Sequence, residues 1–416
     1  MPKKKSLKKK SALLPTPNEF NEKLIIFILA AIQFTHILDF VIVMPLGPMF
    51  MEVFKIGAQE FGFIVSIYAL SACIFGLIGA FYIDRFDRKV ALLTLYIGFI
   101  VGTFFCAISP DFLILMLARI VTGGFAGIMG AVVLSIIGDV VPEERRGKAT
   151  GVIMASFSIA SIVGVPAGLY LANSYNWAMP FYALAGISAL ILFAGYKILP
   201  NINIHRENER PKKILETMTG VFRNSNHLTA FLFITCMIFA GFSVIPFIST
   251  YMVFNVGLTK EQLPYLFFFG GLFTFFTSQY IGRLSDEFGK PKIFRIVAGI
   301  SVIPLLLITN LTQMHVAYAV AITTLFMIFV SGRFVPAMAM INSSADPSYR
   351  GSFMSINTSL QQLASGAASM TAGIIIVSAP DGKLLNYNLV GILAVICTLI
   401  CIFLSTKMKS ATMLRK

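Results

Sequence analysis

Twelve long runs of apolar residues follow one another along the sequence, separated by short segments that hold nearly all of the charge. A helix needs about 20 mostly apolar residues to cross a bilayer, and the runs are of that length. Helices are the expected element because lipid offers the backbone no hydrogen-bond partners, and the runs lack the short alternating pattern of barrel strands. We therefore predict an all-α integral membrane protein with 12 transmembrane helices, at 24–50, 59–82, 90–109, 112–138, 149–172, 179–199, 228–254, 263–284, 293–310, 316–342, 352–378 and 387–406.

The composition supports a membrane protein and excludes other classes. The chain is 57% hydrophobic and 12% charged, whereas a soluble domain carries about 25% charged residues. The net charge of +14 would indicate a nucleic-acid partner if the basic residues covered a folded surface. They lie in loops and tails instead, so we expect no nucleic acid. The five cysteines fall inside apolar runs without metal-site spacing, so we expect no disulfide, metal or cofactor.

Lys and Arg are concentrated on the cytoplasmic side of membrane proteins. With the N-terminus inside, 28 of the 33 basic residues fall on the inner side, and only Lys55, Lys260 and Lys383 fall outside. The N-terminal segment MPKKKSLKKK lacks the apolar stretch and cleavage site of a removable signal. We predict a multi-pass protein of the bacterial inner membrane with both termini in the cytoplasm.

One long polar segment divides the runs into two sets of six. It contains the sequence NINIHRENERPKK, and such a basic linker is a natural domain boundary. The predicted organisation is a basic cytoplasmic tail (1–23), an N-terminal six-helix bundle (24–199), a cytoplasmic linker (200–227), a C-terminal six-helix bundle (228–406) and a second cytoplasmic tail (407–416).

Landmarks repeat between the two sets at a nearly constant offset. Asp84 and Asp286 lie 202 residues apart, Pro45 and Pro246 lie 201 apart, and the Arg-Gly pairs that begin at 146 and 350 lie 204 apart. These offsets indicate a duplicated six-helix unit. Two such halves, related by an axis along the membrane normal, are a transporter architecture.

Three motifs lie in the runs and in the loops between them. Residues 80–89, AFYIDRFDRK, follow the pattern G-x-L-x-D-R-x-G-R-[RK] with Ala80 and Asp87 in place of its glycines, and GRLSDEFGK at 282–290 is the second-half copy, with Glu287 in place of the arginine. The fourth run holds R-x-x-x-G from Arg119, and the fifth holds GVPAG at 164–168, a variant of G-P-x-x-G. Over essentially its whole length, the chain resembles the major facilitator superfamily, which carries these motifs, and within it the 12-helix drug:proton antiporter or sugar-efflux-like branch. This resemblance implies two six-helix bundles related by a pseudo-two-fold axis.

Asp39 is the only one of 19 acidic residues that lies in the middle of a run. An ionisable group at membrane depth is costly and is a functional hypothesis by default, and a carboxylate there can load and release a proton. His36 lies three residues earlier on the same helix face and can modulate or share that proton. We predict that Asp39 is the proton-coupling or substrate-cation site, with His36 beside it. The alternative for each residue is a structural hydrogen bond within the bundle.

Two arginines also lie inside the runs. The resemblance implies that Arg119 influences proton transfer in the first half, and its depth argues against a side chain that reaches out to the interface. Arg333 has no first-half counterpart, since the matching position is near Met129. Arg333 is predicted to bind an anionic substrate or act in a gate. The alternative is an ion pair near the cytoplasmic end of its helix.

The charged loop signature is expected to form a cytoplasmic gate, with the candidate residues Asp84, Arg85, Arg88, Asp139 and Asp286. The resemblance implies that Asp84 contacts the second half near the eleventh span, while Arg88 pairs with Asp139 at the end of the fourth. An acid at a helix C-terminus is unfavourable against the helix dipole, which argues for such a partner. Asp87 stands where the signature has glycine, and we expect it to pair locally with Arg88 or Lys89.

Five further residues are predicted to pack helices closely: Gly123 and Gly127 in the fourth span, and Gly164, Pro166 and Gly168 in the fifth. Glycines four residues apart let two helices approach. Close packing of this kind suits a surface that opens and closes, and the proline is expected to loosen the helix around it.

The sequence favours a secondary active transporter that exports a small molecule, such as a drug, sugar or metabolite, in exchange for protons. The chain has no nucleotide-binding loop, because GKAT at 147–150 lacks the upstream glycine of a P-loop. The first alternative is a proton-coupled importer or facilitator of a small sugar or organic anion. A membrane receptor or enzyme remains as a third, although no nucleophile–base pair or large extramembrane domain is present. The expected partners are the substrate, protons and lipid, with the protein acting as a monomer.

Overall fold

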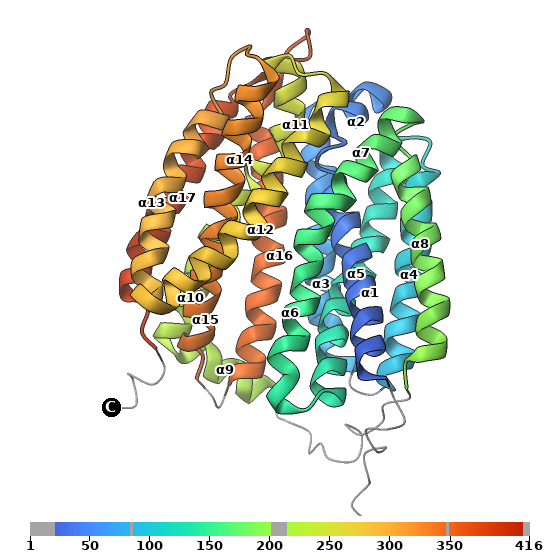
Figure 1. Cartoon of the computed structure of the whole chain (residues 1–416), viewed down its shortest axis with the longest axis vertical. Coiled ribbons are helices and arrows are strands. Elements are labelled where there is room, and N and C mark those ends of the chain that lie inside the picture. The colour runs from blue at the N-terminus through green and yellow to red at the C-terminus, as the bar shows by residue number, and fades with distance from the viewer. Residues whose placement is uncertain (1–20, 84–85, 201–213, 347–348, 411–416) are drawn as a thin grey trace, which may run out of the picture.

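The first half of the chain forms a bundle of long helices that stand side by side (Figure 1). The computed structural model describes residues 21–83, 86–200, 214–346 and 349–410. The first-half elements are α1 (Glu22–Ile42), α2 (Gly47–Phe54), α3 (Ala58–Tyr82), α4 (Arg88–Ala107), α5 (Phe112–Val140), α6 (Glu143–Ile159), the π-helix η2 (Ala160–Gly164), α7 (Val165–Ser174) and α8 (Met179–Ile198).

The second half forms a similar bundle beside the first, on the left in Figure 1. Its elements are α9 (Ile214–Arg223), α10 (Ser225–Phe242), η4 (Ile245–Phe247), α11 (Ile248–Tyr251), η5 (Met252–Val256), η6 (Lys260–Gln262), α12 (Leu263–Phe288), α13 (Lys290–Ile308), α14 (Val316–Gly332), α15 (Phe334–Ser344), α16 (Arg350–Ile375), β1 (Val377–Ser378), β2 (Leu384–Leu385) and α17 (Tyr387–Lys407). The two short strands pair antiparallel as a hairpin.

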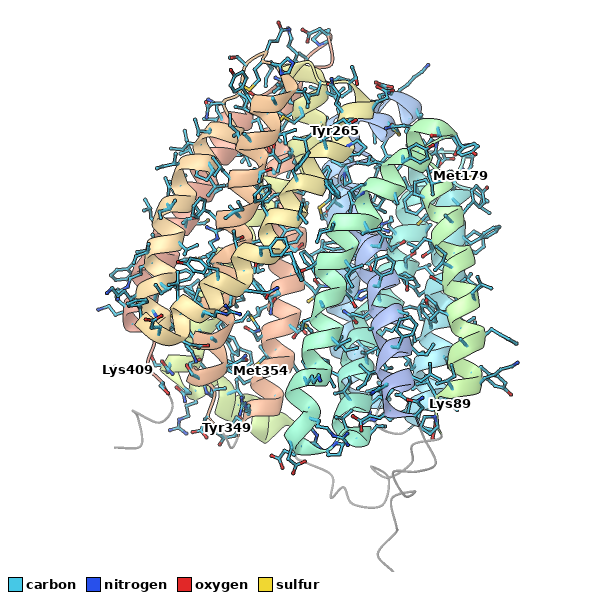
Figure 2. The ribbon with its side chains drawn as sticks, in the orientation of Figure 1. Lys89, Met179, Tyr265, Tyr349, Met354 and Lys409 are labelled. Atoms are coloured by element: carbon cyan, nitrogen blue, oxygen red, sulfur yellow. The ribbon has the colours of Figure 1, made fainter. Side chains whose placement is uncertain are left out.

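The bundles have two ends, which we name by a helix at each. The α2 end carries α2, α11 and the strand hairpin, and Figure 2 labels Met179 and Tyr265 there. The α9 end carries α9, and Figure 2 labels Lys89, Tyr349 and Lys409 near it.

Ten helical stretches among the described residues are long and apolar enough to cross a membrane. Three of them join consecutive elements: Glu143–Ser174, Ser225–Val256 and Val316–Ser344. The helices α12 and α16 are not in this set, although each is 26 residues long and lies among the spanning helices in Figure 1. The α16 sequence is rich in Ser, Thr, Asn and Gln, which lowers its hydropathy. These two helices complete the 12 that the sequence predicts.

Several predicted spans are broken rather than continuous. The run 24–50 is two helices, because α1 ends at Ile42 and a turn that contains Pro45 leads into α2. The run 228–254 breaks at the matching place, where Pro246 lies in η4. Proline removes a backbone donor and clashes with the preceding helical turn, so both halves end their first span at the same landmark.

Each half has its own apolar core, and a third core joins the halves. One cluster, which includes Ile28, Tyr96 and Val133, belongs to the first half, and another, which includes Phe233 and Phe353, belongs to the second. The third cluster combines residues of both halves from the part of the bundle nearest the α2 end; among them are Phe50, Phe61, Phe247 and Leu266. The halves therefore pack most intimately toward that end.

Candidate functional site

The Asp39 carboxylate and the Arg119 guanidinium form a buried ion pair in the first half. Nη1 of Arg119 lies 2.7 Å from Oδ2 of Asp39 and also donates to the Asp39 carbonyl oxygen at 3.3 Å. The other carboxylate oxygen, Oδ1, accepts a hydrogen bond from Oγ1 of Thr103 at 3.2 Å. Both charged side chains are 0% exposed. Three helices, α1, α4 and α5, thus converge on one carboxylate.

A tyrosine ring completes the surroundings of the arginine. The Arg119 guanidinium carbon lies 4.2 Å from the centre of the Tyr68 ring on α3, a distance at which the ring's quadrupole attracts a cation. Nε and Nη2 of Arg119 have no acceptor among the described residues. The guanidinium is therefore held by one carboxylate and one aromatic face, and it keeps unused donors.

The energetics of this pair make it sensitive to any change in charge. Taking two charges out of water is costly, and their mutual attraction offsets that cost only while both are charged and well aligned. Removing one partner of a buried pair typically costs about 3–5 kcal/mol, because the other charge is left uncompensated. Neutralising Asp39 would leave Arg119 in that situation unless the surrounding helices move.

His36 lies one helical turn from Asp39 but forms no hydrogen bond with it in the described part of the chain. The His36 ring is edge-on to the Phe99 ring, with centroids 6.4 Å apart. Its Nδ1 atom is buried and has no partner among the described residues. The structure thus places His36 beside the pair, against α4, rather than in it.

Arg333 occupies the break between α14 and α15 and is 2% exposed. Its Nη1 donates to Oγ1 of Thr398 at 2.8 Å and to Oγ of Ser301 at 3.3 Å. No carboxylate within the described ranges pairs with it, and its Nε and Nη2 have no acceptor there. Arg333 thus faces α13 and α17, inside the second bundle.

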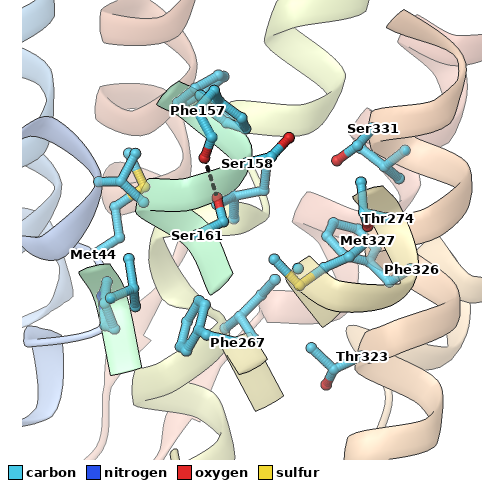
Figure 3. A pocket seen from close by; sticks show the side chains of 18 residues that line it. Met44, Phe157, Ser158, Ser161, Phe267, Thr274, Thr323, Phe326, Met327 and Ser331 are labelled. Carbon is cyan, nitrogen blue, oxygen red and sulfur yellow. Dashed lines mark hydrogen bonds between the residues drawn. The ribbon is translucent and has the colours of Figure 1, made fainter. Parts of the chain in front are cut away.

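A cavity of about 100 Å³ lies between the two halves. Figure 3 shows its first-half wall, with Phe157, Ser158 and Ser161, opposite a second-half wall that carries Thr274, Thr323 and Met327. The cavity is lined by Val41, Met44, Pro45, Phe157, Ser158, Ser161, Val165, Phe242, Ile245, Ile248, Phe267, Gly271, Thr274, Thr323, Phe326, Met327, Val330 and Ser331. Contributions from both halves make it the candidate substrate site.

None of the four predicted charged site residues lines this cavity. Asp39, His36, Arg119 and Arg333 are absent from its wall. The hydroxyls at Ser158, Ser161, Thr274, Thr323 and Ser331 are the polar side chains of the lining, and sequence reasoning missed them. A serine or threonine inside an apolar run is a weak signal, because its hydroxyl can also bond to its own helix, as Ser161 does to the Phe157 carbonyl oxygen at 3.0 Å.

Three of the predicted gate residues are among the described residues: Arg88, Asp139 and Asp286. Nε of Arg88 lies 3.4 Å from Oδ2 of Asp139, the pairing that the family resemblance implied. Asp286 is exposed near the end of α12. Asp84 and Arg85 lie outside the described residues. The gating role of all five therefore stays a prediction.

Asp87 has a role that the sequence analysis did not identify. It is the N-cap of α4, where its Oδ1 accepts hydrogen bonds from the backbone N–H groups of Lys89 at 2.9 Å and Val90 at 3.1 Å. Capping satisfies donors that the first helical turn leaves free. The sequence analysis expected Asp87 to pair with the charged side chain of Arg88 or Lys89, and it did not predict these hydrogen bonds to the backbone.

The predicted packing glycines lie at contacts inside the first half. A methyl group on Gly123 or Gly127 would lie 2.4 Å or 2.2 Å from the carbonyl oxygen of Tyr68 or Ala72 on α3. Gly164 and Gly168 face the side chains of Leu38 and Ile42 on α1 instead. The nearest contacts of these four glycines are therefore with helices of the same half, and the expected surface that opens and closes stays a prediction.

Pro166 follows a π-helical turn. The backbone N–H of Val165 donates to the carbonyl oxygen of Ala160, five residues earlier, and Pro166 stands in the first turn of α7. The local helix is therefore wider at the point where the sequence predicted loosening, and a π-turn of this kind is frequent at functional sites. Ser161, in that turn, lines the cavity.

Glycines between the halves were missed by sequence reasoning. A methyl group on Gly62 of α3 would lie 2.9 Å from the Ser369 carbonyl oxygen of α16, and one on Gly271 of α12 would lie 3.2 Å from the Ile162 nitrogen. These contacts bring α3 against α16 and η2 against α12.

Three polar contacts join the halves at the α2 end. Lys260 forms an ion pair with Glu52, and its carbonyl oxygen accepts a hydrogen bond from Nδ2 of Asn173 at 3.0 Å. The backbone N–H of Ala58, at the start of α3, donates to Oγ of Ser378 at 2.9 Å. Together with the shared apolar core, these contacts close the α2 end.

Two bundles of spanning helices with a cavity between them define a membrane transport protein. The sequence profile of the Major Facilitator Superfamily matches residues 29–369 and, in a second match, residues 231–413. The chain belongs to this superfamily of membrane transporters, which are not enzymes and which bind small-molecule substrates within the membrane. It is a multi-pass membrane protein.

Individual relatives support the same family. The chain is 25% identical over 355 residues to the "Uncharacterized MFS-type transporter YceJ" of Bacillus subtilis, covering 84% of this chain and 88% of the relative. The crystal structure of a D-xylose-proton symporter superposes with a TM-score of 0.74 at 16% identity over 91% of this chain and 97% of the symporter. A bacterial homolog of the human lysosomal transporter Spinster, in an inward-facing conformation, gives a TM-score of 0.73 at 14% identity, covering 93% of this chain and 98% of the homolog. The likeness to these two solved structures, at 14% and 16% identity, shows the fold alone.

Proposed function

We propose that this protein is a secondary active transporter that exports a small molecule across the bacterial inner membrane in exchange for protons. The observation that carries the proposal is the Asp39–Arg119 ion pair, fully buried in the first half with a 2.7 Å contact. A carboxylate at membrane depth marks a proton or ion pathway in transporters. Asp39 is the proposed proton acceptor, and Arg119 is the group that competes with the proton.

The pair can couple proton binding to a change of conformation. A proton on Asp39 removes the charge that holds Arg119, and the guanidinium is then left with unpaired donors in a dry site. The protein can relieve that cost by a rearrangement that gives Arg119 water or other acceptors. Two states that differ in their affinity for the proton are what alternating access requires.

A path from the pair to the second half is present. The Tyr68 ring, which faces Arg119, stacks on the Phe40 ring with centroids 5.2 Å apart, and the Phe40 ring lies 5.8 Å from that of Phe242 on α10. Phe242 also lines the cavity. This chain of aromatic contacts supports coupling between the titrating site and the cavity.

The proposed orientation places the α9 end in the cytoplasm, and the same side is proposed for both termini. The distribution of Lys and Arg supports it. The contacts that close the α2 end then support an inward-facing form, in which the periplasmic side is shut. We further propose that the protein acts as a monomer, with substrate, protons and lipid as its partners.

The test uses purified protein and one conservative substitution. A thermal-shift screen against metabolites and drugs at pH 6 and pH 8 first identifies a stabilising compound, whose uptake into proteoliposomes is then measured with and without an imposed pH gradient. We expect accumulation driven by the pH gradient in the wild type and its loss in Asp39→Asn. The asparagine keeps the size of the side chain and one oxygen that can accept from Arg119, but it cannot carry the proton.

Asp111→Asn is the matched control. Asp111 is the N-cap of α5, and its Oδ1 accepts from the Ile114 backbone at 2.9 Å; asparagine caps a helix about as well. This variant should transport like the wild type. Gradient-driven transport by Asp39→Asn at the wild-type rate would refute the coupling role.

The same vesicles decide between export and import. Counterflow of the compound without a pH gradient reports binding and exchange. Uptake with an imposed pH gradient reports whether the compound moves with the protons or against them. Substrate accumulation on the side of higher proton concentration indicates antiport, and accumulation on the opposite side indicates the alternative, a proton-coupled importer.

A further inference from the structure

We propose that the cavity between the halves binds an uncharged group with an apolar body and one or two hydrogen-bonding atoms, which the hydroxyls of Thr274 and Thr323 recognise. The inference rests on the proposed transport function only in taking this cavity as the substrate site. The proposed ligand is uncharged. From the sequence, by contrast, Arg333 was predicted to bind an anionic substrate or to act in a gate.

The wall of the cavity excludes charge. Its 18 lining residues include no Asp, Glu, Lys, Arg or His. A charged ligand would lose its hydration without gaining a counter-ion, and burial of an unpaired charge is strongly unfavourable. The buried charges of the protein are directed elsewhere, because Arg119 is paired with Asp39 and Arg333 faces Ser301 and Thr398.

Two hydroxyls in the wall are free to recognise a ligand. Oγ1 of Thr274 on α12 and Oγ1 of Thr323 on α14 are buried, and neither has a hydrogen-bond partner in the described part of the protein. Most buried polar atoms are paired. An unpaired hydroxyl on a residue of the cavity wall can turn toward a ligand and pair with it without breaking an existing hydrogen bond. Figure 3 shows both threonines on the second-half wall.

The apolar side chains of the cavity wall determine which apolar body and which size of ligand the cavity accepts. Phe267 and Phe326 present aromatic surface, and Met44 and Met327 present flexible thioethers that adapt to different shapes. At about 100 Å³ the cavity is smaller than the apolar cavity of about 150 Å³ that holds benzene. In this conformation it therefore accepts a small ligand, or one ring-sized end of a larger one after slight expansion.

Four probes of nearly equal size test the charge and the hydrogen bond separately. Benzyl alcohol is neutral with a hydroxyl, ethylbenzene is its apolar isostere, and at neutral pH benzoate is an anion and benzylamine a cation. Equilibrium binding of each radiolabelled probe is measured on the full-length protein in nanodiscs, and empty nanodiscs give the partition into lipid. We expect benzyl alcohol to bind at least about ten-fold more tightly than either charged probe.

The hydroxyls are tested by substitutions that keep volume. Thr274→Val and Thr323→Val should each weaken the binding of benzyl alcohol by about three- to ten-fold, which is the usual net contribution of one hydrogen bond. The affinity for ethylbenzene should stay the same or increase. Thr274→Ser and Thr323→Ser, which keep the hydroxyl, should bind benzyl alcohol nearly as the wild type does. Retained ethylbenzene binding shows that a valine variant is folded.

Thr277→Val is the matched control on the same helix. The Thr277 hydroxyl already donates to the Phe273 carbonyl oxygen at 2.8 Å, and Thr277 is not part of the cavity wall, so benzyl alcohol should bind unchanged. The proposal is overturned if a charged probe binds as tightly as benzyl alcohol, if benzyl alcohol shows no saturable binding, or if the valine variants affect both neutral probes equally. The assay measures equilibrium binding to protein with an intact Asp39 at a single pH, so a failure of proton coupling is seen only in transport and not here.

Discussion

The Arg119 guanidinium shows how a single charged residue is accommodated inside this membrane protein. It is held by the Asp39 carboxylate, 80 positions away in the sequence, and by the face of the Tyr68 ring. The scarcity of acids in the spans identified Asp39 as a candidate, and the motif of the fourth span identified Arg119. Their direct pairing and the Thr103 hydrogen bond are tertiary facts, since no local pattern says which faces of α1, α4 and α5 meet.

Asp87 gives a prediction at the same scale. Because its carboxylate caps α4, Asp87→Ala should lower the free energy of unfolding by about 1 kcal/mol, the usual cost of losing such a cap. Asp87→Ser keeps an oxygen that accepts the same backbone hydrogen bonds, so the free energy of unfolding should fall much less. The measurement is the unfolding midpoint of the purified variants in detergent. If serine were as damaging as alanine, the negative charge rather than the cap would be what the site needs.

At the scale of helices, proline and glycine decide where a span breaks and which helices come close. In each half the first helix ends just before the matching proline, Pro45 or Pro246. The nearly constant sequence offset indicated that the prolines correspond, but both spans were predicted as continuous. The π-turn after α6 and the break after α14 were not predicted as such, although Pro166 had indicated a loosened helix near the first of them. Long apolar runs conceal them, because a π-turn and a helix break remain apolar in composition, and only the positions of Val165 and Arg333 in the folded chain reveal them.

Close contact of α5 with α3 gives the prediction at this scale. Gly127→Ala would place a methyl group 2.2 Å from the Ala72 carbonyl oxygen, whereas a methyl group on Gly130, three residues along α5, meets nothing within 4 Å. Overpacking against backbone costs about 1–3 kcal/mol, so Gly127→Ala should unfold at a lower temperature or fail to accumulate in the membrane. Gly130→Ala should be neutral or stabilising by about 0.5–1 kcal/mol, because alanine restricts the unfolded chain. Equal stability of the two variants would contradict the packing seen here.

The whole molecule consists of two bundles. The proposed alternating access requires them to move against each other, and such a movement would break the contacts at the α2 end. An ion pair that water can reach, such as that of Glu52 with the half-buried Lys260, contributes little by itself, about 0–1 kcal/mol. The apolar core shared by the halves therefore supplies most of the free energy that keeps this end closed. Closure that is spread over many weak contacts can be reversed by a modest change elsewhere, such as binding of substrate or a proton.

A disulfide across the halves tests whether opening of the α2 end is needed for transport. An ideal Cβ on Gly57 would lie 3.8 Å from Cβ of Ser378, which is the mean separation in disulfides. The double variant Gly57→Cys, Ser378→Cys should therefore cross-link under mild oxidation and lose transport of the compound found in the screen. A reducing agent should restore it.

The single variants, treated with the same oxidant, control for the native cysteines and for loss of the Ser378 hydrogen bond. Cross-linking is verified by mass spectrometry of the joined peptides. Undiminished transport by a fully cross-linked protein would show that the α2 end does not open during the cycle.

The sequence by itself determined the all-α membrane fold, the family and the one acidic residue placed at membrane depth. These follow from features that a single segment carries: apolar length, the placement of charge, and short motifs. Only the tertiary structure decided that Arg119 pairs with Asp39, that Arg333 turns into its own bundle, and that uncharged side chains from both halves line the cavity. The physical reason is that, in lipid, the outer and inner faces of a spanning helix are both apolar. Hydrophobic pattern then carries little information about which face meets a neighbour, and that choice is made by the packing of segments far apart in the chain.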